Sequence, residues 1–149
     1  MELKQLPLLQ PGEDDVIIKV KSCGVNFPDL LQVQGKYQFK PPLPFAPGGE
    51  IAGIVSSVGS DVVNFKIGDK VTALTGYGGF SSYVRAKEYQ ILKMPSGLSF
   101  EQASAFTMTY GTTYYALKDR AQLKEGETLL ILGASGGVGT AAIELGKIM

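Results

Sequence analysis

The sequence predicts a β-rich module followed by an α/β unit. Short strand candidates separated by Gly, Pro, Asp or Asn recur through the first ninety or so residues, and this spacing is typical of a small all-β barrel or sandwich. Near residue 96 the pattern changes to helical periodicity, and then to an apolar strand, a glycine-rich turn and an amphipathic helix. That order is typical of a strand–turn–helix unit in a parallel sheet.

The first module contains five strand candidates. The run "VIIKVK" at 16–21 is rich in β-branched residues and lies between the turn signals Pro11-Gly12 and Gly24. The other candidates are residues 51–58, 70–74, 81–85 and 89–93. The stretch 34–49 holds four of the chain's eight prolines, which excludes a regular helix, and its aromatic and leucine residues predict an ordered, mostly extended loop.

Helical signals begin at Ser99, which with Gln102 has the spacing of a capping box. The helical pattern continues to about Ala121, and we expect Gly111 to break it into two helices. Residues 128–132 then predict a short strand buried on both faces of a parallel sheet. The final helix is predicted from apolar residues at helical spacing, Val138, Ala141, Ala142 and Leu145.

The turn before that helix has the spacing Ala134-x-Gly136-x-x-Gly139. This is the dinucleotide-binding fingerprint G-x-G-x-x-G with its first glycine replaced by alanine. In such a loop Gly136 would let a pyrophosphate approach the backbone, and Gly139 would let the helix pack closely. The positive end of the helix dipole would meet the phosphates. The alternative is a plain glycine-rich turn without a ligand, but the strand and helix predicted on either side favour a nucleotide.

Composition excludes several classes of function. The 14 basic residues equal the 14 acidic residues, so no net charge favours nucleic acid. No apolar run reaches the length of a membrane span, and we expect a soluble intracellular protein. With no histidine and one cysteine, the chain has no Ser-His-Asp or Cys-His arrangement and no usual zinc ligand set, so we predict no metal. Cys23 is predicted to be a small buried hydrophobe.

Four ordered motifs carry a resemblance to a known family: "CGVNFPDLLQVQGKY", "PGGEIAGIVSSVG", "KIGDKV" and "GASGGVG". In order and spacing they resemble the medium-chain dehydrogenase/reductase superfamily, and in detail its zinc-free branch of zeta-crystallin and quinone oxidoreductase-like proteins. Zinc-dependent relatives carry a cysteine ligand where this chain has Asn26 and a histidine where it has Gly49. The resemblance therefore agrees with the absence of metal ligands.

The resemblance implies a GroES-like β-barrel domain over residues 1–96, without its first strands, and over 97–149 the truncated beginning of a Rossmann domain, a doubly wound parallel sheet that binds NAD(P). The active site would lie in the cleft between them. Members of the branch transfer hydride from NADPH to quinones or α,β-unsaturated carbonyls. The preference for NADPH over NAD comes from the family alone, because the residue that separates them is expected about 20 positions beyond the glycine loop.

By the same resemblance, Asn26 and Tyr37 are the candidate catalytic residues. The candidate cofactor-binding residues share the nicotinamide end or the pyrophosphate loop and are Asn26, Thr113, Ala134, Ser135, Gly136, Gly137, Val138 and Gly139. Three of these candidates have a structural alternative: Asn26 as a turn former, Tyr37 as loop packing and Thr113 as an ordinary helix residue. Leu31 replaces a tyrosine found over the nicotinamide in several relatives, and Asp29 is expected to brace the loop or touch ligand.

Three alternatives to this reductase remain open at the level of sequence. They are an enoyl-thioester reductase of the same superfamily, a non-enzymatic structural or trafficking member, and an inactive fragment, since relatives extend further at both ends. The family implies a homodimer that acts on a small-molecule quinone or enone without membrane or nucleic-acid partners. We expect it in the cytoplasm, with the mitochondrion as the alternative.

Overall fold

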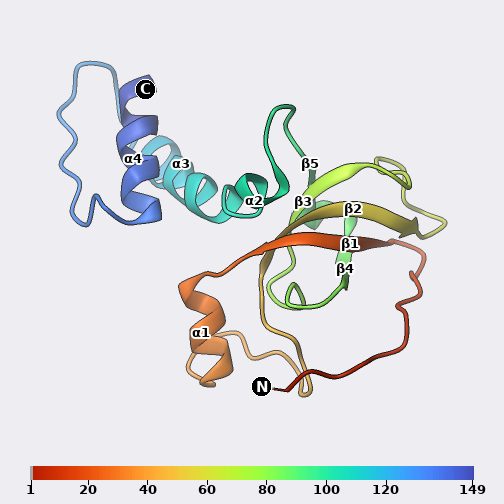
Figure 1. The fold of residues 1–149 in the computed structure, drawn as a ribbon. Coiled ribbons are helices and arrows are strands. Elements are labelled where there is room, and N and C mark those ends of the chain that lie inside the picture. The colour runs from red at the N-terminus through yellow and green to blue at the C-terminus, as the bar shows by residue number, and fades with distance from the viewer. Residues whose placement is uncertain (1) are drawn as a thin grey trace. The chain divides into compact units, whose positions relative to one another are not determined.

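The computed structural model describes residues 2–149, which form two compact units, residues 2–105 and 106–149. The first unit contains the antiparallel sheet, and the second contains helices and loops (Figure 1). The division falls nine residues beyond the domain boundary expected at 96/97, because helix α2 (Phe100–Ala103) packs with the sheet. The domain boundary itself stays a prediction.

Five strands form a single antiparallel sheet: β1 (Asp15–Gly24), β2 (Glu50–Val58), β3 (Lys70–Leu74), β4 (Tyr83–Lys87) and β5 (Ile91–Lys93). Their order is β4-β1-β2-β3-β5, so the two longest strands lie inside the sheet. All five strand predictions are confirmed in kind. The fourth strand begins two residues later than predicted, and the first half of the fifth prediction is the 3₁₀ turn η1 (Glu88–Gln90).

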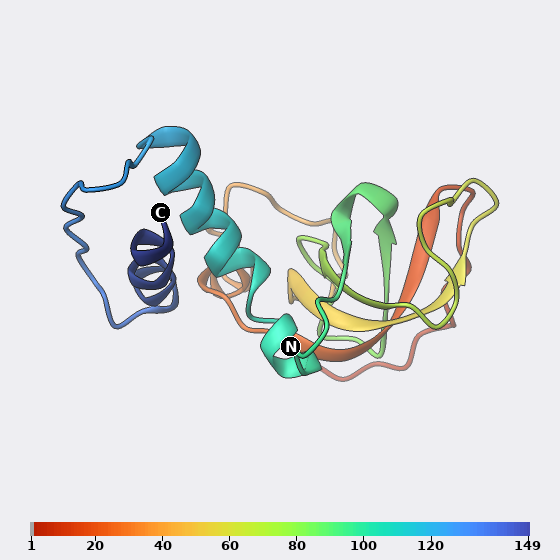
Figure 2. The ribbon, with the colours of Figure 1, turned by 90° about the horizontal axis from the view of Figure 1, so that it is seen from above.

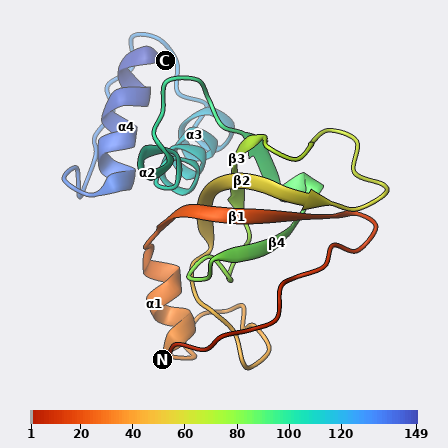
Figure 3. The same ribbon diagram turned by 45° about the vertical axis from the view of Figure 1, so that its right-hand side comes forward.

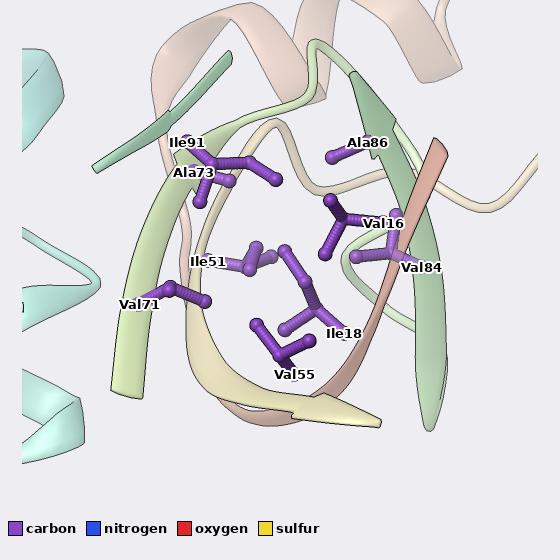
Figure 4. Close-up of a cluster of buried hydrophobic side chains, with 9 residues drawn as sticks. All are labelled: Val16, Ile18, Ile51, Val55, Val71, Ala73, Val84, Ala86 and Ile91. Carbon is purple, nitrogen blue, oxygen red and sulfur yellow. The ribbon is translucent and has the colours of Figure 1, made fainter. Parts of the chain in front are cut away.

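The core of this unit lies on the concave side of the sheet, which curls around nine buried side chains (Figure 4). They are Val16, Ile18, Ile51, Val55, Val71, Ala73, Val84, Ala86 and Ile91. Seven of the nine are β-branched or large aliphatic residues, which suit a pleated, buried surface, and each large one contributes about 1.5–3 kcal/mol when fully buried. This core anchors β1 through Val16 and Ile18 and β2 through Ile51 and Val55.

Helix α1 (Phe27–Val33), which follows β1 directly, was not predicted from the sequence (Figure 3). Its polarity is inverted: the polar Asp29 and Gln32 are buried, whereas Phe27, Leu30 and Val33 are exposed. A search for an inward apolar stripe cannot find such a helix. Its signals were Asn26 as N-cap, Pro28 in the first turn and an acid at the third position.

The capping box of α2 is confirmed. The Gln102 amide donates to Ser99 Oγ at 3.2 Å, and the Ser99 amide donates to Gln102 Oε1 at 2.9 Å. The hydroxyl of Ser104, the C-cap residue of α2, lies 2.7 Å from Ser22 Oγ on β1. A Cβ at Gly24 would lie only 2.4 Å from the Ser104 carbonyl oxygen, so the absence of a side chain at Gly24 lets α2 pack against the central strands.

The second unit shows that the predicted break at Gly111 is wrong. The π-helical η2 (Thr107–Gly111), α3 (Thr112–Tyr114) and the π-helical η3 (Tyr115–Arg120) follow one another without interruption, as Figure 2 shows. Gly111 has helical angles, φ −63° and ψ −45°. The interruption lies earlier, in the turn 104–106. Glycine lowers helix stability without forbidding the helix, and here the neighbouring residues prevail.

The predicted strand at 128–132 is also wrong: this segment has no regular secondary structure and belongs to no sheet. Leu130 and Leu132 are more than four-fifths exposed, whereas a strand in a parallel sheet is covered on both faces. A β-ladder requires a neighbouring strand for its hydrogen bonds, and no described segment of the chain pairs with these residues. Their side-chain contact is with the final helix, where Leu129 lies close to Gly146.

Helix α4 (Gly137–Ile148) confirms the last predicted element. Ala141 and Ala142 are buried and Leu145 is half-buried, as its periodicity predicts, but Val138 is about half exposed. Within residues 2–149, no helix is long and apolar enough to cross a membrane.

Candidate functional site

The residues predicted to form the site fall in both units of the structure. Asn26 and Tyr37 belong to the sheet unit, and Thr113 and the glycine loop belong to the helical unit. We describe each group within its own unit.

Asn26 lies between β1 and α1 and is the N-cap of the helix, where it forms a capping box with Asp29. Its backbone amide donates to Asp29 Oδ2 at 2.8 Å. Its side-chain Nδ2 donates to Glu50 Oε2 at 2.9 Å, across to the first residue of β2. Asn26 is therefore held through both its main chain and its side chain, while it remains only half-buried.

Asp29 braces this part of the chain, which is one of the two roles expected for it. Besides the Asn26 amide, its carboxylate accepts a hydrogen bond from the Gly49 amide at 3.0 Å. One buried carboxylate thus joins the start of α1 to the segment that leads into β2. On the same helix the buried Gln32 donates through Nε2 to the Gly76 carbonyl oxygen at 3.0 Å. Sequence reasoning missed Gln32, because nothing in its local pattern marks it as buried.

Tyr37 is half-buried in the loop after α1. Its backbone amide donates to the Leu31 carbonyl oxygen at 3.2 Å, and the Lys36 amide donates to the same oxygen at 2.8 Å. These bonds turn the chain back at the end of the helix. The structure therefore holds Tyr37 and Leu31 in one turn, and their proposed roles beside a nicotinamide remain predictions.

Cys23, just before the site, is a half-buried thiol packed against backbone. A Cβ at Gly48 or Gly79 would lie 2.7 Å or 2.6 Å from its Sγ. Burial, with a smaller contribution from the negative charge of Asp29, raises the pKa of the Cys23 thiol to about 11. A thiol with so high a pKa is a poor nucleophile at neutral pH.

The glycine loop leads directly into α4 through a turn at 132–135. Gly133 has a positive φ of 73°, and its carbonyl oxygen accepts from the Gly136 amide at 3.2 Å. No side chain caps α4, whose N-cap is Gly136. Since the first amides of a helix have no acceptor within it, the N-terminus of α4 presents N–H groups on an exposed surface formed by Ala134 to Val138.

The two glycines of the motif differ in their surroundings. A Cβ at Gly139 would lie 2.3 Å from the Gly133 carbonyl oxygen and 2.7 Å from Ala134 Cα, so this residue packs tightly against the loop. A Cβ at Gly136 would meet only the Gly133 carbonyl oxygen, at 3.6 Å. Close packing at Gly139 and open space at Gly136 are the arrangement that binding of a diphosphate at this loop requires.

Thr113 is buried within the helical unit, 2% exposed. Its Oγ1 lies 2.7 Å from the Thr109 carbonyl oxygen and 3.3 Å from the Val138 carbonyl oxygen in the first turn of α4. The hydroxyl has a single proton, so it can donate one hydrogen bond at a time. The shorter contact, with the Thr109 carbonyl oxygen, is the better hydrogen bond. This position brings Thr113 next to the glycine loop and gives it a structural contact there.

In the part of the chain that the structure describes, no three His, Cys, Asp or Glu side chains are grouped so that they could hold a metal ion.

Comparison with known proteins places this geometry in a family. Residues 12–96 match the alcohol dehydrogenase GroES-like domain. A quinone oxidoreductase-like protein 2 homolog from Nematostella vectensis is 44% identical over 135 residues, which are 90% of this chain and 37% of that protein. The human quinone oxidoreductase is 41% identical over 138 residues, 92% of this chain and 42% of that protein.

Solved structures agree. The quinone oxidoreductase of Thermus thermophilus, which was also solved in complex with NADPH, has a TM-score of 0.86 at 36% identity and covers 99% of this chain and 46% of its own. The CurK enoyl reductase has a TM-score of 0.88 at 29% identity, over 97% of this chain and 46% of its own. The chain thus spans less than half the length of these relatives. It belongs to the alcohol dehydrogenase GroES-like family, within the medium-chain dehydrogenase/reductase superfamily that includes the quinone oxidoreductases.

Proposed function

We propose that the protein to which this chain belongs is an NADPH-dependent reductase that transfers hydride to quinones or α,β-unsaturated carbonyls without a metal. The observation that carries the proposal is the glycine loop: an uncapped, exposed helix N-terminus with open space at Gly136 and tight packing at Gly139. Family membership and the relative that was crystallised with NADPH support it.

The loop fits the diphosphate of a dinucleotide in charge and in shape. The N-terminus of α4 carries about half a positive charge from the helix dipole, which favours an anion there. The backbone amides of Gly137 and Val138 would hold the phosphate oxygens, and no side chain at Gly136 obstructs their approach. The coenzyme, when bound, supplies the hydride, and the protein supplies position and exclusion of water.

In the sheet unit we propose that Asn26 and Tyr37 contact the nicotinamide and the acceptor. Asn26 is suited to orienting a ligand because its amide is fixed by Glu50 and its backbone by Asp29. The outer face of α1, with Phe27 and Leu30 exposed, offers an apolar surface of the kind that a flat quinone ring prefers. Thr113 supports the first turn of α4 in this proposal.

An enoyl-thioester reductase is the second candidate, because a solved enoyl reductase has nearly the same fold over this chain. The two activities use the same hydride donor and differ in the acceptor, so the residues described here are common to both. The homodimer and the cytoplasmic location stay predictions from the family resemblance.

The test measures NADPH oxidation by the full-length gene product against a panel of quinones and against crotonyl thioesters. Turnover of quinones is expected, and turnover of thioesters alone would assign the second candidate. Titration with NADPH and NADH, followed by nicotinamide fluorescence, gives the coenzyme preference independently of any acceptor. If neither NADPH nor NADH binds, the result would contradict the proposed function and favour the non-enzymatic alternative. We expect the 149-residue chain alone to bind weakly or not at all.

A further inference from the structure

A buried carboxylate at the start of β2 enters the function proposed above only as a hydrogen-bond partner of Asn26. Glu50 is fully buried, 0% exposed, and is among the largest such side chains in the chain. It pairs with Gly24 of β1 and with Leu74 of β3, so sheet hydrogen bonding fixes its backbone on both sides. Burying an acid is costly unless it is hydrogen-bonded. The burial of Glu50 therefore depends on its hydrogen-bond partners.

One such partner is the side chain of Asn26, whose Nδ2 lies 2.9 Å from Glu50 Oε2. In the structure Glu50 Oε2 accepts this hydrogen bond, whereas an amide has a donating end and an accepting end. Glu50 therefore selects which end of the Asn26 amide faces the protein. The place next to it is kept open by Gly24, where a Cβ would lie 3.1 Å from Glu50 Oε2.

We propose that Glu50 is a positioning residue, which fixes the polarity of the Asn26 amide toward the coenzyme and the acceptor. The proposal rests on the proposed function, since it assigns Asn26 to ligand contact. Asp29 sets the backbone of Asn26 through the amide hydrogen bond, and Glu50 sets its side chain. Rotation of the amide about its last bond would turn the oxygen to Glu50 and place two acceptors together, so only one orientation is stable.

The primary test is the variant Glu50→Gln in the full-length gene product. Glutamine has the same shape but presents either an oxygen or an amide nitrogen, so the preference for one orientation of Asn26 is lost. We expect kcat to fall at least about tenfold, with the dissociation constant of NADPH changed less than about twofold, because the diphosphate contacts of the glycine loop are untouched.

Asp15→Asn is the matched control. Like Glu50, Asp15 is a buried carboxylate, but it lies on β1. It forms ion pairs with Lys87 at 2.8 Å and with Arg85 at 3.3 Å. It lies nine residues from Gly24 along the strand, roughly 30 Å away. We expect it to lower the melting temperature and leave kcat unchanged. A kcat in Glu50→Gln equal to that of the wild type, or a loss that merely matches the loss of stability as in the control, would overturn the proposal.

A second measurement uses the wild type alone, so it depends neither on catalysis nor on the folding of a variant. In the NMR spectrum of the coenzyme-free wild type, the two Nδ2 protons of Asn26 should differ strongly in shift, and the one bonded to Glu50 should exchange slowly with solvent. Degenerate, rapidly exchanging protons would overturn the proposal. Failure of the wild type to bind or oxidise NADPH instead overturns the proposed function, and these two failures are distinguished by the same set of experiments.

Discussion

Gly136 and Gly139 lie three residues apart and differ in what an added methyl group would meet. Gly139 is enclosed by the Gly133 carbonyl and by Ala134, whereas Gly136 faces open space with an extended backbone that any residue adopts, φ −83° and ψ 166°. The fold therefore requires one of these glycines and leaves the other free. The diphosphate proposed above would account for a glycine at 136.

Gly136→Ala is expected to leave stability within about 0.5 kcal/mol of the wild type, because its new Cβ makes only an ordinary contact. The same methyl group would obstruct a phosphate, so we expect the NADPH dissociation constant of the full-length protein to rise roughly tenfold, about 1.4 kcal/mol. Urea unfolding and fluorescence titration measure the two quantities.

Gly139→Ala is the counterpart, with a Cβ 2.3 Å from the Gly133 carbonyl oxygen. It is expected to lower the free energy of unfolding by about 1–3 kcal/mol through overpacking. Equal effects of the two substitutions on stability would contradict the structural distinction between them.

Cys23 gives a prediction that depends on pH. Burial, then the charge of Asp29, raises its pKa from 9.0 to about 11. Near pH 8 the thiolate is therefore about 100-fold scarcer than in an unperturbed thiol, and alkylation by iodoacetamide should be slower by a similar factor. Unfolding the chain in urea should restore the ordinary rate, and a fast reaction in the folded protein would show that the thiol is accessible.

The same shift makes stability decline in alkaline solution. The folded state retains its proton between pH 9.0 and about 11 while the unfolded state loses it. The thiol's contribution is complete below pH 9, falls as the pH rises through that interval, and is gone above the folded pKa. Cys23→Ala should remove this part of the pH dependence.

Residue roles were only partly accessible from the sequence. The resemblance could mark Asn26 by its place in a motif, but not the contact with Glu50, 24 positions away. Such a contact depends on β1 and β2 being paired in a particular register. Asp29 was foreseen as a brace or a ligand residue, and the structure supplies the two amides that it braces.

At the scale of secondary-structure elements, the strands were the most predictable. They are short, β-branched and separated by turn residues, and the residues of β3 were predicted with the observed bounds. The capping box of α2 is local chemistry and was equally accessible. Helix α1 was missed because its buried face is polar, and the strand at 128–132 was wrong because pairing is not a local property of the sequence.

Gly111 provides the test at this scale. Because its angles are helical and a Cβ there would meet no atom within 4 Å, Gly111→Ala should stabilise the protein by roughly 0.5–1 kcal/mol. The gain is measured by the midpoint of urea unfolding, with Ser104→Ala in the preceding turn as a comparison that removes the Ser22 contact and should destabilise. A destabilised Gly111→Ala would mean that a helical break exists there after all.

At the scale of the whole molecule, the chain consists of two units of unequal character. Residues 2–105 enclose a continuous aliphatic core within a five-stranded sheet, whereas residues 106–149 contain two helical stretches and an exposed apolar segment. This contrast was predictable in outline from the change of pattern near residue 96. The boundary between the two units was not, because it depends on the packing of α2 against β1 and β2, which includes the Ser22–Ser104 contact.

Limited proteolysis should report this difference. Trypsin is expected to cut first at the exposed Lys124, in the turn before residues 128–132, and much later at Lys19 or Lys70 within the sheet. Cleavage in a strand requires the ladder to open, which costs free energy that a surface turn does not. Mass spectrometry of the early fragments identifies the first site, and early cuts inside β1 would contradict the described core.

The inverted polarity of α1 has a consequence for divergence among related proteins. Its inward side chains, Asp29 and Gln32, provide the attachments that the fold needs, so the outward Phe27, Leu30 and Val33 can vary with little penalty for folding. In most helices the apolar residues form the core, so they cannot vary without a cost to folding. Single substitutions at these three positions could therefore change the chemistry of this surface during evolution while the protein still folds.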